Sequence, residues 1–286
     1  METSKIELQR ERDFGEIFNT SFTFVRQEIK PFGMAILVFI IPTLIVLTLF
    51  SKFQSASLVM YNRFWGSILS LIIALIMQTV IFSTVYSYLN LYFKKFKDIT
   101  IKELFIEIKY NFFRVLWALI VTVTLIVLVV LLGYWLFANA APSLGIILGS
   151  LIGCYLLVSL SMLNASLIFE DIGFGSAFSR SFQLSHMKWW GTFLILLIGG
   201  VILIVIILIL QSPVFVLGIV GRLHNNYGIF ENFSTMLIIY SNVATALGQV
   251  FYIIPAILAA FQYFNLVEMR EKPSLREKIN ELGKDE

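Results

Sequence analysis

Long uncharged stretches alternate with short charged segments along this chain. Five of the stretches contain between 21 and 55 consecutive residues without Asp, Glu, Lys or Arg. A helix needs about 20 apolar residues to cross the hydrocarbon core of a bilayer, so each stretch is long enough to span. The longest stretch, 115–169, exceeds one helix and is interrupted at Pro142, which follows small residues and favours a tight turn. The pattern predicts six spans, at about 33–51, 65–92, 115–137, 143–168, 189–210 and 236–266.

Three short helices with one apolar face are predicted before the odd-numbered spans. Residues 14–22 read FGEIFNTSF and residues 174–182 read FGSAFSRSF, with five of nine positions identical. The segment 101–109 keeps apolar residues at i, i+3, i+4 and i+7, the spacing of one helix face. Because each is too short and too charged to span, we expect these elbow helices to lie at the membrane interface. The candidate interfacial residues are Phe14, Phe18, Phe22, Phe174, Phe178, Phe182, Arg180, Lys188, Trp189 and Trp190.

Capping-box patterns indicate where two of the elbows begin. Asp13 is followed three residues later by Glu16, and Thr100 is followed in the same way by Glu103. In such a pair the first side chain accepts from a free amide of the helix start, and the acidic side chain reaches back. We therefore expect helices to start after Asp13 and after Thr100.

The even-numbered spans end in a shared pattern of a polar residue, two large apolar residues and an asparagine. The polar pairs are Ser87 and Asn90, Ser161 and Asn164, and Gln262 and Asn265. The two members of each pair lie three residues apart and therefore share a helix face. Only four asparagines lie well inside the predicted spans, and three of them are here. These residues either hydrogen-bond between helices or form a polar ring that lines a cytoplasmic vestibule or contacts lipid headgroups.

Together these patterns predict an internal threefold repeat of elbow, span and span. The units cover about 13–92, 98–168 and 173–267, within a single membrane domain that comprises residues 1–286. All three copies have the same orientation, unlike the inverted repeats of many secondary transporters. Residues 268–286 form a charged tail.

The distribution of Lys and Arg predicts the orientation of the spans. The segments before the first span and after the second, fourth and sixth hold 18 of the 21 Lys and Arg residues, and the other connections hold three. Because positively charged segments stay in the cytoplasm, both termini are predicted to be cytoplasmic. All five tryptophans fall near predicted span ends, where indole rings prefer to lie.

Glycine and proline positions suggest how the spans pack. Gly145, Gly149 and Gly153 form a row of small residues on the fourth span, which allows close helix approach. That face either packs within the chain or contacts a partner or a second copy. Pro42 and Pro255 each follow two isoleucines inside a span and are expected to kink it, because proline removes a helical hydrogen bond.

The segment 211–235 is expected to be the longest connection on the outer side. Its residues 213–220 are apolar but too few to span, which favours a position in the interface. Arg222, His224 and Glu231 are either solvated loop residues or a surface cluster.

Composition agrees with this fold class and excludes others. Of the residues, 58% are hydrophobic and 14% are charged, and the mean hydropathy is +0.87. Soluble domains carry about 25% charged residues. These values exclude a soluble globule, a disordered chain and a disulfide scaffold, and the single cysteine, Cys154, has no partner for an internal disulfide. The predicted fold class is all-α, a polytopic membrane protein with six transmembrane helices.

The chain shows no pattern typical of catalysis. No ionisable residue lies deep inside a predicted span, although ion-coupled transporters usually keep such groups there. His186 and His224 lie in connections, and no residues have metal-ligand or phosphate-loop spacing. We therefore expect no enzyme activity, no catalytic residues, no cofactor and no metal. Nucleic acid is not an expected partner, because the basic residues lie at the bilayer surface.

The segment AFSRSFQLSHMKWWGTFLILL at 177–197 resembles the repeated unit of a bacterial membrane-protein family. That family is known as a membrane domain fused to some glycerophosphodiester phosphodiesterases and as stand-alone proteins of unknown function. The resemblance extends best over residues 14–32 and 170–268. It implies a six-helix inner-membrane fold and no established activity, and no phosphodiesterase activity is expected because the catalytic barrel is absent from this sequence.

Two functions are consistent with these observations. The first is a scaffold or subunit of a membrane protein complex in the bacterial inner membrane, whose partners are the lipid bilayer and other membrane proteins. The alternative is a transporter or lipid-handling permease without ion-coupling residues. The sequence leaves the oligomeric state open.

Overall fold

The chain is all helical in a computed structural model that describes residues 6–46, 48–49, 63–95, 99–139, 141–224 and 227–275. No strand occurs within these ranges. The helices are α1 (Phe14–Gln27), α2 (Ile29–Ala35), the π-helix η1 (Ile36–Ile40), α4 (Arg63–Lys95), α5 (Ile101–Phe137), α6 (Pro142–Leu160), α7 (Leu163–Phe169), α8 (Phe174–Met187), α9 (Trp189–His224), α10 (Tyr227–Val250) and α11 (Ile253–Glu271).

Six helical segments are long and apolar enough to cross a membrane. They are Ile29–Val46, Gly66–Lys94, Ile101–Phe137, Pro142–Phe169, Trp189–Ile219 and Ile239–Glu271. Their number and order confirm the all-α, six-span prediction. The protein is therefore a multi-pass integral membrane protein.

The elbows differ from one another, which corrects one part of the predicted repeat. Backbone angles leave helical values at Glu28 (φ −93°, ψ 15°) and at Lys188 (φ −137°, ψ 56°), so α1 and α8 are separate helices. The middle elbow, 101–109, continues without interruption into the third span as α5. Residues 110–114 contain no glycine or proline that would end the helix. Both predicted capping boxes, at α1 and α5, are present.

The predicted outer loop at 211–235 is also wrong, because α9 and α10 extend through most of it. Pro213 lies inside α9 and leaves the carbonyl of Ile209 without its helical donor. The hydroxyl of Ser212 donates to that carbonyl at 2.7 Å, which compensates for the missing amide. The side chains of Arg222, His224 and Glu231 lie outside the described residues.

Other spans are interrupted near the predicted kinks. The π-helix η1 ends two residues before Pro42, and α10 ends immediately before a turn at Phe251 and Tyr252. Pro255 is the third residue of α11. An N–H group at this position would have no acceptor within the helix, so the missing N–H of proline costs no hydrogen bond. The fourth span is broken between α6 and α7, which sequence inspection did not anticipate.

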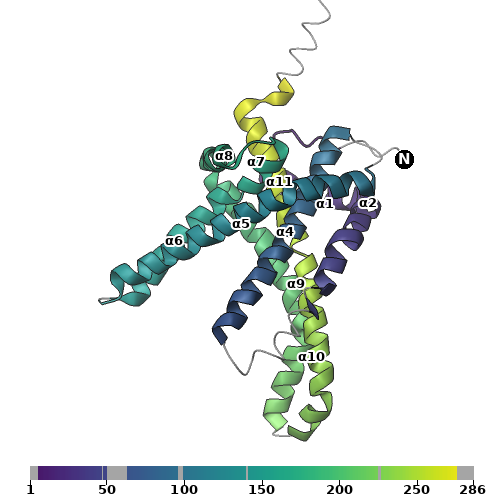
Figure 1. Ribbon diagram of the computed structural model, residues 1–286, viewed down its shortest axis with the longest axis vertical. Helices are drawn as coiled ribbons and strands as arrows, with labels where there is room; N and C mark the ends of the chain where they lie inside the picture. The colour runs from purple at the N-terminus through teal and green to yellow at the C-terminus, as the bar shows by residue number, and fades with distance from the viewer. Residues whose placement is uncertain are drawn as a thin grey trace, which may run out of the picture.

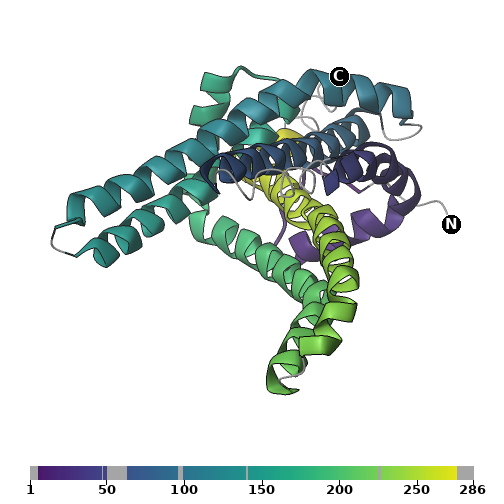
Figure 2. The same ribbon diagram turned by 60° about the horizontal axis from the view of Figure 1, so that its bottom comes forward.

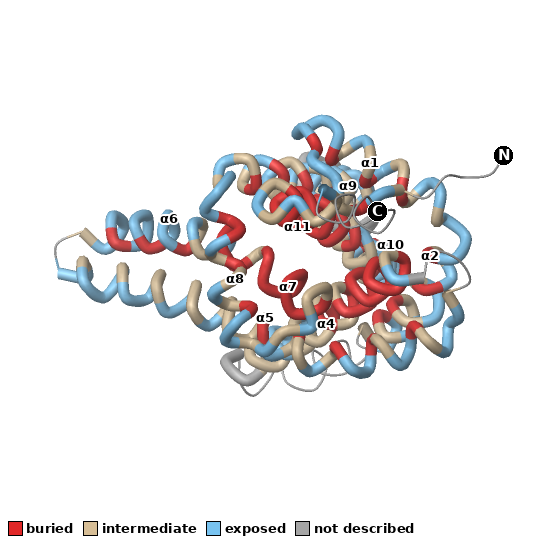
Figure 3. Tube along the Cα trace, turned by 90° about the horizontal axis from the view of Figure 1, so that it is seen from above, coloured by how far each residue is buried: buried red, intermediate tan, exposed pale blue. Residues whose placement is uncertain are grey.

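Buried residues gather where α1, the C-terminal half of α4, α7, α8 and α11 meet (Figure 3). We call this region the hub. Nearly all of α11 from Ala256 to Glu268 is buried there. Aromatic rings fill its centre: the ring centroid of Phe24 lies 5.2 Å from that of Tyr92 and 5.8 Å from that of Phe261. The hub joins the first, middle and last thirds of the chain.

Beyond the hub the helices diverge as hairpins. The α5–α6 pair and the α9–α10 pair extend from it in different directions (Figures 1 and 2). In the most apolar stretch of α5 only 11% of the residues are buried, and in that of α9 only 17%. The corresponding share in the span that contains α11 is 44%. Most of each hairpin surface is therefore free to contact lipid or another protein.

Candidate functional site

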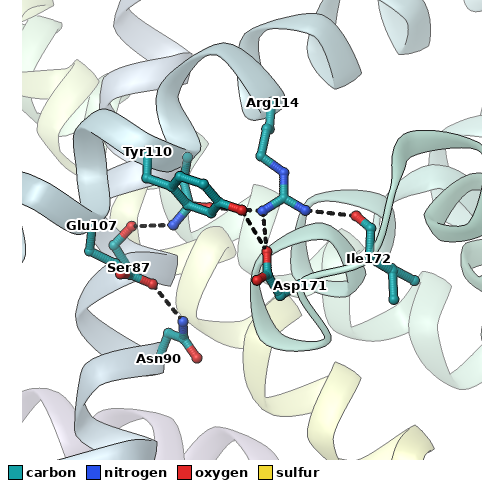
Figure 4. Close-up of polar contacts among 8 residues, drawn as sticks. Ser87, Asn90, Glu107, Tyr110, Arg114, Asp171 and Ile172 are labelled. Carbon is teal, nitrogen blue, oxygen red and sulfur yellow. Dashed lines mark hydrogen bonds and ion pairs between the residues drawn. The ribbon is translucent and has the colours of Figure 1, made fainter.

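The pair Ser87 and Asn90 lies in the hub and faces α5 (Figure 4). The amide of Asn111 donates to the Ser87 hydroxyl at 3.2 Å, and the Asn90 amide donates to Glu107 at 2.8 Å. Ser87, Asn90 and Asn111 are each at most 2% exposed. These contacts fasten α4 to the beginning of α5.

The same network continues to the loop between α7 and α8 (Figure 4). Arg114 forms an ion pair with Asp171 at 2.6 Å and donates to the carbonyl of Ile172 at 2.7 Å. The hydroxyl of Tyr110 donates to Asp171 at 3.2 Å. The hydrogen bond from Arg114 holds the pKa of Asp171 below its ordinary value. Asp171 has a left-handed backbone (φ 50°), which these contacts stabilise.

The pair Gln262 and Asn265 forms a second buried network on α11. Gln262 donates to the hydroxyl of Thr192 at 3.0 Å, and Asn265 donates to Gln262 at 3.4 Å. The backbone amide of Arg12 donates to Asn265 at 2.8 Å. The Arg12 guanidinium lies 5.7 Å from the ring centroid of Phe261, and burial lowers the pKa of Arg12. This network attaches the segment before α1 to the last helix.

Serine hydroxyls cap the end of α6, where the pair Ser161 and Asn164 lies. A helix end leaves its last carbonyls without partners. Ser161 donates to the carbonyl of Val158 at 2.7 Å, and Ser185 donates to that of Ser159 at 3.1 Å. Ser181 also donates to the Ser159 carbonyl. The elbow α8 is thereby held against the break between α6 and α7.

The three asparagines are therefore bonded differently. The Oδ1 atoms of Asn90 and Asn164 are buried and have no hydrogen-bond partner among the described residues, whereas that of Asn265 is satisfied. A buried acceptor of this kind usually binds an ordered water. All three asparagines are at most 8% exposed, and none lines either of the two pockets described below. Ser87, Asn90, Gln262 and Asn265 thus bond to residues of other helices or segments, whereas Ser161 bonds to the end of α6.

Arg180 pairs with two carboxylates of the hub. Its guanidinium pairs with Glu170 at 2.9 Å and with Glu271 at 2.5 Å, and Tyr263 donates to Glu170 at 2.5 Å. Burial alone would lower the pKa of Arg180, but the bonds to the two carboxylates outweigh it and raise the pKa. Arg180 therefore links α7, α8 and α11, and its predicted headgroup contact stays a prediction.

The elbow phenylalanines lie on the outer faces of their helices. The inner face of α1 buries Ile17, Ser21 and Phe24, and Phe14 and Phe22 are 41% and 47% exposed on the other side. The remaining four, Phe18, Phe174, Phe178 and Phe182, are half-buried against the edge of the core. Lys188 is exposed, Trp189 is half-buried and Trp190 is 71% exposed.

The glycine row packs against α5 within the chain. A Cβ atom at Gly145 would lie 2.2 Å from the carbonyl oxygen of Gly133, and one at Gly149 would lie 2.9 Å from the Cα atom of Val130. A Cβ atom at Gly153 would lie 3.3 Å from a methyl group of Ile126. The glycines therefore allow the backbones of α5 and α6 to approach closely.

A half-open pocket of about 210 Å³ lies between η1 and its continuation, α4 and α10. Asn242, Thr245 and Gln249 line it from one face of α10, and Ser70 lines it from α4. Among the described residues, no three His, Cys, Asp or Glu side chains gather into a metal site. The polar groups of this pocket are uncharged hydroxyls and amides.

Sequence inspection missed three of these polar residues. Asn111 continues the buried face of α5 through Leu104, Ile108 and Val115, so extending the elbow periodicity by two turns would have found it. Asn242 is the fourth asparagine inside a span. No local pattern distinguishes Arg12, because its burial depends on α11.

The chain matches no protein-family model, no curated protein and no solved structure. The resemblance seen at 177–197 therefore stays a prediction.

Proposed function

We propose that the protein is a non-enzymatic scaffold or subunit of a membrane protein complex in a bacterial inner membrane, with both termini in the cytoplasm. The observation that carries this proposal is the low burial of the diverging hairpins, at 11% for α5 and 17% for α9. Helix association in lipid depends on close packing and interhelical hydrogen bonds. A hairpin that contacts few other helices of its own chain gains little close packing and few interhelical hydrogen bonds. The helices of a partner protein would supply both kinds of contact.

The hub supports the same proposal because it is filled and cross-linked. Ring contacts and the networks around Arg114, Arg180 and Asn265 connect all three thirds of the chain there. Ser87, Asn90 and Gln262 bond to residues of neighbouring helices, and none of the six paired residues lines either pocket. A rigid platform with two projecting hairpins suits a component that positions other proteins.

Site-specific photo-crosslinking in native membranes tests this proposal. A photoreactive residue replaces Leu131 on α5 or Ile209 on α9, which are 56% and 65% exposed. We expect discrete protein adducts that are the same in independent preparations. The matched control irradiates the same variants after complete solubilisation in dodecyl sulfate, which should abolish the adducts. Adducts with lipid alone at both positions would contradict a scaffold role.

The pocket between α4 and α10 favours the alternative, a transporter or permease. Polar groups at membrane depth are tolerated where they line a water-filled cavity, and the uncharged lining suits a neutral cargo. A Thr245→Cys variant in a Cys154→Ala background tests this alternative. A transport path predicts labelling by a membrane-impermeant maleimide from both sides of the membrane, and a scaffold predicts labelling from neither side.

A further inference from the structure

A surface groove of about 640 Å³ lies where α6, the elbow α8 and the end of α11 meet. These elements come from the middle and last thirds of the chain and lie together at the hub (Figure 1). The described residues that line it are Tyr155, Phe182, Gln183, His186, Met187 and Arg270. Its volume is in the range of sites that hold small organic groups.

Among the described residues of this lining, every polar side chain can donate a hydrogen bond and none is a carboxylate. The donors are the Tyr155 hydroxyl, the Gln183 amide, the His186 imidazole and the Arg270 guanidinium. Gln183 donates to Ser179 at 3.2 Å. Among the described residues, no carboxylate pairs with Arg270. An acceptor-rich anion therefore complements the groove.

Arg270 differs from Arg180, a basic residue of α8, in whether a carboxylate neutralises its charge. Glu170 and Glu271 already neutralise Arg180 inside the hub. Arg270 and His186 are exposed at the surface and are free to contact a ligand. Arg270 is also suited to a phosphate group because its planar fork donates two parallel bonds.

Apolar and aromatic groups complete one side of the groove. Phe182 and Met187 line it directly, and Tyr155 stacks on Trp189 with ring centroids 5.7 Å apart. Trp190, beside it, is 71% exposed, as expected for a ring at the headgroup level of a bilayer. A soluble phosphate would leave these apolar surfaces uncovered, whereas the glycerol and first methylenes of a lipid would cover them.

We propose that this groove binds the phosphate headgroup of an anionic phospholipid from the leaflet that faces the hub. Arg270 and His186 contact the phosphate, and Phe182 and Met187 contact the beginning of the acyl chains. This site is separate from the scaffold proposal and requires only that the hub lies at a membrane surface.

Native mass spectrometry of the full-length protein in detergent tests the site. The protein is titrated with phosphatidylglycerol or with phosphatidylcholine of identical acyl chains. A cationic site near anionic headgroups gains roughly fivefold in affinity for each basic residue. We therefore expect tighter retention of phosphatidylglycerol, and a loss of about fivefold or more in the Arg270→Gln variant.

The matched control is Arg26→Gln, which removes an exposed arginine from the last turn of the other separate elbow, α1. It should reduce retention clearly less than Arg270→Gln does, because Arg26 does not line the groove, and Arg270→Lys should restore part of the loss. Equal losses in the two Gln variants would overturn the site in favour of general surface charge. The absence of a preference for phosphatidylglycerol would overturn it as well.

A competition arm distinguishes lipid from soluble phosphate. Glycerol 3-phosphate at millimolar concentration should leave bound phosphatidylglycerol in place. Efficient displacement would refute the lipid assignment and indicate a site for a soluble phosphate ester. Because Arg270 is exposed and has no carboxylate partner in the described part of the chain, the variant should keep the melting temperature of the wild type. A folding defect would contradict its assignment as a ligand-binding residue.

Discussion

Alanine substitutions along the glycine row test how the α5–α6 hairpin is held together. At Gly145 the new Cβ atom would lie 2.2 Å from the Gly133 oxygen and 2.9 Å from a side-chain carbon of Phe137. Ordinary van der Waals contact begins near 3.4 Å, so the two backbones must separate by about 1 Å. Overpacking of this kind costs about 1–3 kcal/mol, and Gly145→Ala should reach the upper part of that range because backbone atoms cannot rotate away.

The other glycines should follow a graded order. Gly149→Ala meets the Val130 backbone at 2.9 Å and should cost about 1–2 kcal/mol. Gly153→Ala meets only a methyl group of Ile126 at 3.3 Å and should cost less than about 1 kcal/mol. Gly200 on α9 has no neighbour within 4 Å, so Gly200→Ala should be neutral or stabilise by up to about 1 kcal/mol through helix propensity.

Unfolding of the purified variants in mixed micelles with increasing dodecyl sulfate, followed by circular dichroism, measures these differences. The control Gly200→Ala measures the effect of a methyl group that is added without a steric clash. The reasoning is refuted if Gly145→Ala and Gly200→Ala unfold at the same detergent fraction. Loss of a cross-linked dimer without any loss of stability would instead assign the glycine row to contact with a second copy.

Further predictions concern the hub and the elbows. Asn111→Leu should lower stability by only about 0.6 kcal/mol in the same unfolding assay, the average for interhelical hydrogen bonds in a membrane protein; a cost above about 2 kcal/mol would contradict this interpretation. Arg180→Gln leaves two partly buried carboxylates without their cation and should cost about 1–3 kcal/mol, and an effect no larger than that of Asn111→Leu would refute the linking role. Asp171→Asn should have a smaller effect than Arg180→Gln, because the Asp171 side chain is 61% exposed. Since the pKa of Asp171 is lowered in the folded protein, its contribution should be complete above its ordinary pKa of 3.8 and be lost as the pH falls below that value, which pH-dependent unfolding measures. Phe178→Asp should lower folded yield in membranes, and unchanged yield and melting temperature would count against a half-buried elbow.

The sequence predicts the spans well because uncharged length and charge placement are local properties. The boundaries of the helices depend on residues that end a helix, and the local sequence predicted these boundaries less well. Residues 211–235 were predicted to form a connection, yet α9 continues through Pro213, where Ser212 donates to the carbonyl of Ile209. The elbow at 101–109 looked like its two counterparts, yet nothing after it interrupts the helix.

Side-chain partners were harder to predict because they depend on residues far apart in the chain. Asn90 and Asn265 were identified as polar groups inside spans, but their partners Glu107 and Arg12 are set by tertiary packing. Arg180 was grouped with interfacial residues because basic residues near Trp189 and Trp190 on the elbow suit anionic headgroups. Two carboxylates, one of them 91 residues further along the chain, make its partial burial tolerable.

The central claim is that the hub forms a platform on the cytoplasmic side of the membrane from which the hairpins project. Cysteine-accessibility labelling in intact cells tests it most directly, in a Cys154→Ala background. Lys95→Cys, at the end of α4, should react with an impermeant maleimide only after the membrane is permeabilised, and Arg222→Cys, near the far end of α9, should react in intact cells. Labelling of Lys95→Cys from outside, together with protection of Arg222→Cys, would contradict this orientation.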